Sequence, residues 1–185
     1  MPRYFIEVSY KGTNYSGFQI QQNANSIQAE IENAFKIFFK KKFELTGSSR
    51  TDAGVHALQN FFHFDSDKKL IFEKDFRYNL NALLSGDIVI KNIFLVKDFA
   101  HSRFDAVSRE YKYFIYQKRD PFLQEIAFYY PYKIDIKQMN EAAQQIINFK
   151  DFSSFSKKNT QVNNFNCNIF KSEWNIDNEK LVYNV

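Results

Sequence analysis

Apolar and polar residues alternate along several stretches of the chain, and a period of two of this kind predicts β-strands. The N-terminal stretch is the clearest, because every second residue from Tyr4 to Tyr10 is apolar or aromatic and would lie on one face. Short apolar runs add further strands, and the IVI sequence at 88–90 is typical of a strand buried on both faces. The predicted strands are Arg3–Tyr10, Phe43–Thr46, Ala57–Asp65, Asp87–Val96, Ser108–Gln117, Phe165–Ile176 and Leu181–Val185.

Three other stretches carry apolar residues at the spacing of one helix face. In the first, Ile27, Ile31 and Phe35 recur every fourth residue, and Asn25 or Ser26 can cap the start. The segment before it, KGTNYSGFQIQQNAN, contains two glycines and many amides and predicts a long polar loop. The predicted helices are Ser26–Lys41, Phe72–Leu84 and Asp135–Phe149.

The order of these elements indicates the fold class. Helices interleave with strands, yet several strands follow one another through short turns, which is typical of an α+β fold with mainly antiparallel sheet and helices packed on one face. A soft boundary near residues 97–107 divides the chain into two expected subdomains, 1–100 and 101–185. The last predicted strand ends within an apolar alternation, so we expect the second subdomain to be truncated at its C-terminus, the alternative being a short natural edge strand.

The composition fits a globular protein with a sizeable core, since 44% of the 185 residues are hydrophobic. The single cysteine, Cys167, excludes an internal disulfide and a cysteine-cluster metal site, and it fits a reducing compartment. The sequence lacks the pattern of a secretory signal and any apolar run that could span a bilayer, so we expect a cytoplasmic protein without membrane contact. The net charge of +4 mildly favours a polyanionic partner.

A polar cluster, GSSRTDAGVHA at residues 47–57, interrupts this aromatic chain and is the main candidate for chemistry. A Ser-His-Asp hydrolase would use one of its serines with His56 and Asp52, but these lie too close in sequence and there is no G-x-S-x-G elbow. A metal site built on His56, His63 and Asp52 has no further ligand nearby. A phosphate-binding P-loop fails on both its lysine and its spacing.

Two interpretations of the cluster remain. The simpler one is a tight turn between strands, in which Arg50 pairs with Asp52 at the surface. The functional one takes Asp52 as a carboxylate held at a strand exit, with Gly54 leaving room for a ligand and Arg50 keeping the carboxylate ionised or gripping a phosphate. A carboxylate without a second acid nearby suits nucleophilic work rather than paired acid–base hydrolysis.

The cluster also resembles a known family signature. Its part RTDAGVHA, Arg50–Ala57, is similar to the signature of the tRNA pseudouridine synthase A family. Further segments resemble that family's motifs in the same order along essentially the whole chain. These segments are Tyr10–Gln19 (YKGTNYSGFQ), Ser26–Gln28 (SIQ), Phe99–Ala106 (FAHSRFDA), Arg109–Tyr113 (REYKY) and Asp151–Phe155 (DFSSF).

The resemblance implies a pseudouridine synthase-like fold in which two related α/β subdomains flank a basic cleft. It implies an isomerase that converts uridine to pseudouridine in the anticodon stem-loop of tRNA, at tRNA positions 38–40. By this resemblance Asp52, in the first subdomain, is the catalytic carboxylate, and Arg50 and Tyr111 bind the substrate. It further implies that the enzyme needs no cofactor and no metal, has tRNA as its partner and forms a homodimer.

Basic residues in or beside loops are candidates for holding RNA phosphates, although a solvated surface is the default for each lysine. Arg103, like Arg50, lies inside a matched motif, which makes it a better candidate. The uracil can stack on Tyr111, although strand alternation alone would pack Tyr111 in the core with Tyr113 and Ile115. The phosphate-binding candidates are Lys11, Arg50, Arg103, Arg109, Lys157 and Lys158.

Departures from the family pattern bear on activity. Ser49 stands where the family often has Gly, which keeps a small residue, and Phe18 stands where Trp is common. Family members continue into a segment of the type N-R-F-x-[RK]-x-M-V-R, which supplies a basic partner for the aspartate, and nothing after Leu181–Val185 provides it. The alternative to an active synthase is therefore a catalytically impaired or non-catalytic fragment that binds tRNA or other RNA.

Overall fold

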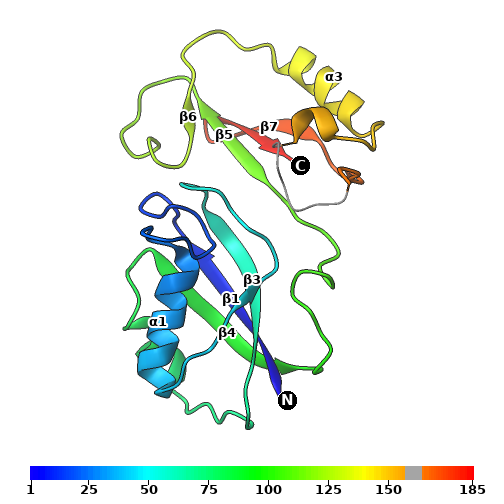
Figure 1. The fold of residues 1–185 in the computed structure, drawn as a ribbon. Coiled ribbons are helices and arrows are strands. Elements are labelled where there is room, and N and C mark those ends of the chain that lie inside the picture. Colours follow the sequence, from blue (N-terminus) through cyan, green and yellow to red (C-terminus); the bar gives the residue numbers. More distant parts are fainter. Residues whose placement is uncertain (157–163) are drawn as a thin grey trace. The chain divides into compact units, whose positions relative to one another are not determined.

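The computed structural model describes residues 1–156 and 164–185. The chain forms two compact units, Met1–Val107 and Ser108–Val185, and each unit contains its own sheet and helices (Figure 1). In the described residues every strand pair but one is antiparallel. The predicted α+β class with mainly antiparallel sheet is therefore confirmed.

The sheet of the first unit consists of β1 (Arg3–Tyr10), β2 (Thr46–Gly47), β3 (Ala57–Asp65) and β4 (Ile88–Val96). Its order is β2-β3-β1-β4, and β1 buries every second residue, as the alternation predicted. The register places His63 of β3 and Phe94 of β4 directly opposite Phe5 of β1. Because directly opposed residues point to the same side, these three side chains share one face of the sheet.

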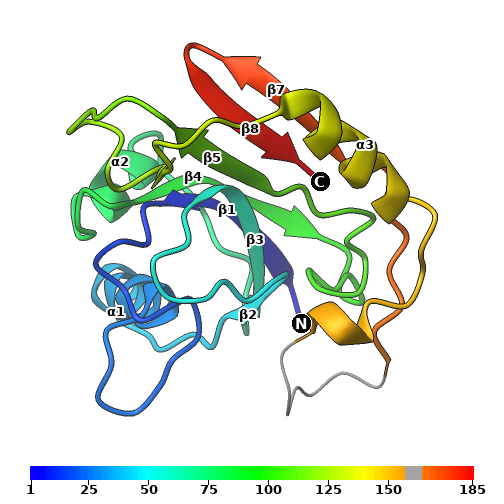
Figure 2. The same cartoon turned by 90° about the horizontal axis from the view of Figure 1, so that it is seen from above.

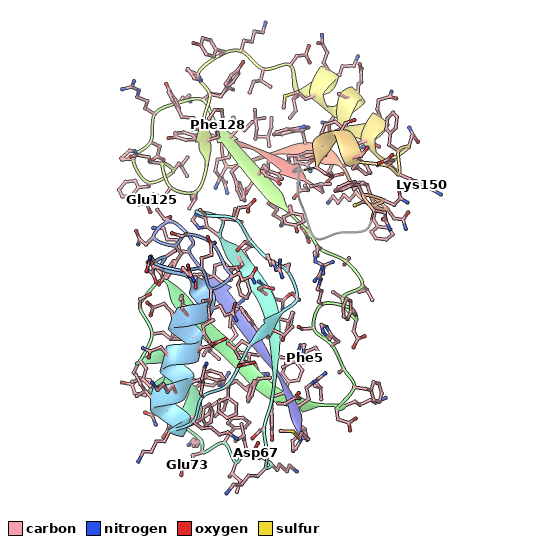
Figure 3. The ribbon with its side chains drawn as sticks, viewed as in Figure 1. Phe5, Asp67, Glu73, Glu125, Phe128 and Lys150 are labelled. Carbon is pink, nitrogen blue, oxygen red and sulfur yellow. The ribbon has the colours of Figure 1, made fainter. Side chains whose placement is uncertain are left out.

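Two helices, α1 (Ile27–Phe39) and α2 (Phe76–Asn81), cover the other face. Helix α1 begins after Ser26, whose hydroxyl accepts a hydrogen bond from the N–H of Ala29, and it ends at Lys40 in the left-handed conformation. Figure 3 shows Phe5 on the side of the sheet away from α1. The first sheet therefore has one face covered by helices and one that carries Phe5.

Helix α2 is shorter than the predicted helix Phe72–Leu84. Its end is set by the Asn81 side chain, which exchanges two hydrogen bonds with the backbone of Ile90 on β4. Before its start, Phe72 packs edge-on against Tyr4 in the core, at 5.8 Å between ring centroids. These contacts with the sheet limit the helix at both ends, although the spacing of apolar residues extends beyond it in the sequence.

An aromatic core joins the sheet to α1. The ring of Phe35 on α1 packs edge-on against Phe64 on β3, with 5.5 Å between centroids, and Phe43 lies 4.8 Å from Phe64. Each buried phenylalanine contributes about 1.5–3 kcal/mol by leaving water. This packing fixes β1 and β3, whose ends carry the loops of the candidate site.

The second unit contains β5 (Lys112–Tyr116), β6 (Phe128–Tyr129), β7 (Glu173–Asp177) and β8 (Lys180–Asn184), in the order β6-β5-β8-β7. Helix α3 (Ile136–Ile146) packs along β7, as Figure 2 shows, and a short 3-10 helix spans Ser153–Phe155. The β5–β6 pair is parallel, and the sequence did not predict β6. No helix in the part of the chain that the structure describes has the length and apolar character to cross a membrane.

Two predicted strands of this unit are longer than those observed. The strand expected over Phe165–Ile176 forms only from Glu173 onward, and the strand expected from Ser108 begins at Lys112. Ser172 accounts for the late start of β7, because it is buried and its hydroxyl donates to the Ala143 carbonyl at the end of α3. The chain before β7 is therefore tied to the helix rather than to a neighbouring strand.

Candidate active site

Two loops at one end of the first sheet interlock. The N-terminal loop, residues 11–25, joins β1 to α1, and the aspartate loop, residues 48–56, joins β2 to β3. They contain all but the first residue of the YKGTNYSGFQ segment and all but the last residue of the RTDAGVHA segment, so these two motifs fold as one structural unit. The hydrogen bonds that join the loops include those from the N–H of Phe18 to the Thr51 carbonyl (3.0 Å), from the N–H of Gly54 to the Tyr15 carbonyl (3.4 Å) and from the N–H of Gly12 to Nδ1 of His56 (2.9 Å).

Two glycines permit this close approach. A Cβ atom on Gly12 would lie 2.1 Å from the carbonyl oxygen of Val55, a distance that no side chain can occupy. Gly17 has a φ of +106° and faces the Thr51 carbonyl, where a Cβ would lie at 3.0 Å. The N-terminal loop therefore needs glycine at both positions to lie against the aspartate loop.

The start of α1 supports the N-terminal loop from its other side. The N–H of Gln28 donates to the carbonyl of Phe18, and the Phe18 ring is buried against Phe62. The hydroxyl of Tyr15 lies 2.8 Å from Oγ of Ser85. Both aromatic residues of this loop are buried, and they anchor it in the core.

A series of hydrogen bonds between side chains connects the aspartate loop to the sheet. Asn60 of β3 accepts a hydrogen bond from the Ser48 hydroxyl (2.7 Å) and donates one to the Tyr10 hydroxyl (3.2 Å). The Tyr10 hydroxyl lies 2.9 Å from Oγ1 of Thr51. Because Tyr10 already accepts from Asn60, its own proton is available for Thr51. Hydrogen-bonded side chains thus connect β3 and β1 to the residue that precedes Asp52.

The side chain of Asp52 is exposed, although the loop that carries it is held by these hydrogen bonds. Its carbonyl accepts a hydrogen bond from the N–H of Val55 (3.2 Å), which closes a tight turn with Gly54 at a φ of +78°. The neighbouring Arg50 is exposed as well, and Lys11 begins the facing loop with an exposed side chain. The structure therefore gathers Asp52, Arg50 and Lys11 on two interlocked loops.

Arg103 is exposed on a different segment of the first unit, residues 97–106. This segment is anchored by Ser102, which is buried and donates its hydroxyl proton to the Thr46 carbonyl of β2 (2.9 Å). The Ser102 hydroxyl also lies 2.8 Å from Nδ1 of His63. Arg103 is therefore held beside the strand that leads into the aspartate loop.

The remaining predicted residues belong to the second unit or lie outside the described residues. Arg109 is exposed shortly before β5, and Tyr111 is 42% exposed and pairs through its backbone with Val185. The alternation that would pack Tyr111 in the core is therefore wrong. Lys157 and Lys158 fall outside the described residues.

The competing chemistries find no support in these contacts. The two serines of the cluster direct their hydroxyls to Asn60, at 2.7 and 3.4 Å, rather than to a histidine. His56 uses Nδ1 to hold Gly12. Among the described residues no group of three or more His, Cys, Asp or Glu side chains is placed to bind a metal ion.

His63, the other histidine considered as a ligand, is buried under the segment that contains Arg103. Burial, followed by the nearby charges of Arg3 and His101, lowers its pKa from 6.5 to about 4. The imidazole is therefore neutral at neutral pH. It serves as a hydrogen-bonding partner of Ser102 and carries no charge to the site.

The sequence analysis missed the residues that position the site. Tyr10 continues the buried alternation of β1, so its pattern indicates only core packing. The position of Asn60 in β3 was a detectable signal, because it shares the inward parity of the buried Phe62 and Phe64. A polar residue at an inward position must have a partner, and here that partner is the loop itself.

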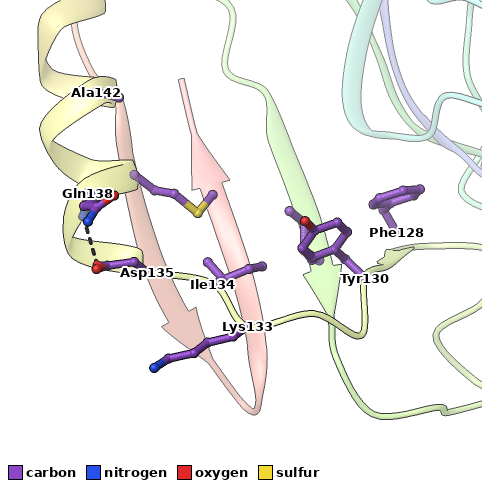
Figure 4. A pocket seen from close by; sticks show the side chains of 9 residues that line it. Phe128, Tyr130, Lys133, Ile134, Asp135, Gln138 and Ala142 are labelled. Atoms are coloured by element: carbon purple, nitrogen blue, oxygen red, sulfur yellow. Dashed lines mark hydrogen bonds between the residues drawn. The ribbon is translucent and has the colours of Figure 1, made fainter.

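A pocket of about 530 Å³ lies in the second unit, between the start of α3 and the β5–β6 edge (Figure 4). Its polar rim includes Lys133, Asp135 and Gln138. The Asp135 carboxylate accepts hydrogen bonds from the backbone N–H groups of Lys137 and Gln138. These bonds cap the N-terminus of α3. The pocket contains none of the predicted site residues.

Comparison with known proteins gives a consistent result. Residues 6–105 match a family model described as tRNA pseudouridine synthase. A protein of Parabacteroides distasonis named tRNA pseudouridine synthase A is 40% identical over 188 residues, which cover 100% of this chain and 73% of that protein. Proteins of the same name from Staphylococcus aureus and Staphylococcus carnosus are 38% and 37% identical over 173 residues, which cover 92% of this chain and 65% and 64% of those proteins. The chain thus spans between 64% and 73% of the length of these relatives.

Proposed function

Because the chain belongs to the tRNA pseudouridine synthase A family, we propose that it isomerises uridine to pseudouridine in the anticodon stem-loop of tRNA, with Asp52 as the catalytic carboxylate. The observation that carries the proposal is the placement of Asp52. Its side chain is exposed, while the backbone on both sides of it is locked to a second loop and to the core. A reactive side chain acts fastest when the backbone that carries it is held in one position.

The reaction needs one nucleophile or base and no change of oxidation state. The N1–C1′ bond of the uridine breaks, a C5–C1′ bond forms, the proton on C5 leaves to solvent and N1 gains a proton. A carboxylate can add to C6 of the base or to C1′ of the ribose. Addition to C6 tethers the detached uracil to the protein while it turns. Addition to C1′ instead holds the ribose, and the detached uracil is then kept in the site by non-covalent contacts alone. The side chain of Asp52 provides that carboxylate.

The substrate has to come out of the RNA stack before it can reach Asp52, which costs a few kcal/mol. We propose that Tyr111 offsets part of this cost by stacking on the uracil, since a base–aromatic contact contributes roughly 1–3 kcal/mol. Arg50, Lys11, Arg103 and Arg109 are exposed and are proposed to hold phosphates. We also propose that the protein acts in the cytoplasm as a homodimer and uses neither cofactor nor metal.

A second candidate function is RNA binding without catalysis. It would use the same exposed basic residues, Arg50, Lys11 and Arg103, to contact the RNA backbone. The two functions predict different results with the same preparation. A synthase forms product at low enzyme concentration, whereas a binding protein shows salt-sensitive affinity for tRNA and forms no product at any concentration.

The test is to incubate the 185-residue chain with unmodified tRNA and to map pseudouridine along the RNA. We expect pseudouridine in the anticodon arm with the wild-type chain and none with Asp52→Ala. Asp75→Ala, at an exposed aspartate before α2, is the matched control and should retain full activity. Modification that persists in Asp52→Ala would refute the role of Asp52, and binding without product would favour the second function.

A further inference from the structure

The face of the first sheet away from α1 carries a continuous row of aromatic rings. The row begins with Phe94 and Phe5, whose centroids lie 6.1 Å apart, and continues to His63, 6.1 Å from Phe5. His101 packs edge-on against His63 at 4.5 Å, and Phe104 lies 4.2 Å from His101. The row therefore leads from the sheet to the segment that carries Arg103.

The last ring of this row stands outside the core. Phe104 is 74% exposed, whereas His63 is 6% exposed. Leaving a phenylalanine in water forgoes about 1.5–3 kcal/mol of burial. An aromatic base that stacks on the ring would recover part of this free energy when the ligand is bound.

Several hydrogen bonds hold the segment that carries Phe104, residues 97–106. The Arg3 guanidinium donates to the Ala100 carbonyl (2.9 Å) and forms a salt bridge with Asp65 (2.7 Å). The carboxylate of Asp105 accepts a hydrogen bond from the N–H of His101 (2.7 Å), and this bond joins the two ends of the turn that contains Phe104. Together with the Ser102 anchor on β2, these bonds fix the backbone that carries Phe104.

A cation lies beside this ring. The guanidinium of Arg103 lies over the Phe104 ring, 5.8 Å from its centroid. A cation on an aromatic face can hold a phosphate while the ring contacts the adjacent base. This pairing of an exposed ring with a cation is the arrangement that single-stranded nucleic acids favour.

We propose that Phe104 is a stacking platform for an unpaired base of the RNA substrate, with Arg103 holding the adjacent phosphate. The proposal rests on the proposed function for the identity of the RNA, since the anticodon loop supplies unpaired bases. It assigns Phe104 to affinity rather than to the chemical step. Its loss should therefore raise the dissociation constant and KM and leave kcat nearly unchanged.

Direct binding tests this platform without relying on product formation. The probes are unmodified tRNA, a single-stranded RNA oligonucleotide with an anticodon-loop sequence and a fully paired RNA duplex. We expect Phe104→Leu to weaken binding of tRNA and of the single strand by about 5- to 150-fold, which corresponds to one lost base stack. Binding of the duplex should not change, because its bases are not available.

Two further variants control the experiment. Phe104→Trp keeps an aromatic platform and should bind single-stranded RNA as the wild type does, with tryptophan fluorescence that is quenched on binding. Tyr78→Leu removes an equally exposed ring from α2, where 78% of Tyr78 is accessible, and should leave affinity unchanged. Unfolding midpoints of all variants should equal that of the wild type, since neither ring belongs to the core.

The outcomes separate this proposal from the proposed function. Wild-type affinity in Phe104→Leu, or equal losses for single strand and duplex, would overturn the platform. Failure of the wild-type chain to bind single-stranded RNA would also overturn it. The expected losses in a chain that forms no pseudouridine would support the platform while refuting the isomerase.

Discussion

The hydroxyl of Tyr10 lies 2.9 Å from Oγ1 of Thr51, and 41 positions of sequence separate the two residues. This contact connects the end of the central strand to the residue before Asp52. Tyr10 is 4% exposed and also accepts a hydrogen bond from Asn60, so its position is fixed by the core. We infer that the core sets the position of the carboxylate through this hydroxyl.

Removing the hydroxyl alone should impair the reaction more than the fold. We expect Tyr10→Phe to lower kcat by about 10-fold or more, because small misplacements of a reacting group are costly. The free energy of unfolding should fall by about 1–2 kcal/mol, since the buried Asn60 and the half-buried Thr51 each lose a hydrogen-bond partner. Single-turnover rates and urea unfolding of the same preparation measure the two effects.

Tyr4→Phe is the matched control for Tyr10→Phe. Tyr4 lies on the same strand and is also buried, and its hydroxyl oxygen accepts a hydrogen bond from a different partner, the N–H of Leu70, at 2.8 Å. It should show a similar loss of stability with unchanged kcat. Equal kcat values for the two variants would show that the Tyr10–Thr51 contact has no bearing on the site.

The contact between the two loops should tolerate no side chain at Gly12. A Cβ there would lie 2.1 Å from the Val55 carbonyl oxygen, and neither backbone can yield without breaking the bond between Gly12 and His56. We expect Gly12→Ala to lower the free energy of unfolding by about 3 kcal/mol or more and to abolish product formation.

Gly86→Ala gives the corresponding control, because a Cβ at Gly86 meets no atom within 4 Å. Its effect on the free energy of unfolding should stay within about 0.5 kcal/mol. Chemical denaturation of both variants measures the difference. If Gly12→Ala were as stable as Gly86→Ala, the loops could not be interlocked as described.

The free energy of unfolding should decrease as the pH is lowered, over a range set by the pKa of His63. Its pKa is about 4 in the folded protein and about 6.5 when unfolded, so between these values the unfolded chain binds more protons. The stabilisation is complete above pH 6.5 and is lost as the pH falls toward 4, by up to about 3 kcal/mol. Asp65, whose pKa is lowered by its hydrogen bond with Arg3, loses its contribution only below about pH 4.

His63→Gln isolates this effect. Urea unfolding at pH 7.5 and pH 5 should show a large loss of stability for the wild type and a smaller one for the variant. The amide keeps a hydrogen-bonding group near Ser102 but does not titrate in this range. The same pH dependence in both proteins would show that His63 does not create it.

Local pattern predicted those elements whose burial follows from their own sequence. Strand β1 and helix α1 are examples, since each buries one regular face. Prediction failed where a side chain bonds to a distant element, as Asn81 does with Ile90 and Ser172 does with Ala143. Such a contact is decided by the tertiary fold, and no local periodicity contains it.

The site divides in the same way. Asp52 and Arg50 stand out as candidates in the sequence, because their motif combines reactive groups with a glycine turn. The residues that hold the motif, such as Tyr10 and Asn60, have the parity of core positions and were not recognised. Chemistry is visible in residue types, whereas positioning depends on which strands lie side by side.

The most direct test of the central claim measures proton release from C5 of uridine. A tRNA transcript labelled with tritium at uridine C5 releases its label only when the C5–C1′ bond forms, so an excess of protein gives the rate of one turnover. We expect release with the wild-type chain and a rate lower by at least about 1,000-fold with Asp52→Asn, which changes only the carboxylate. Release at the wild-type rate from Asp52→Asn, or no release from the wild type, would contradict the account.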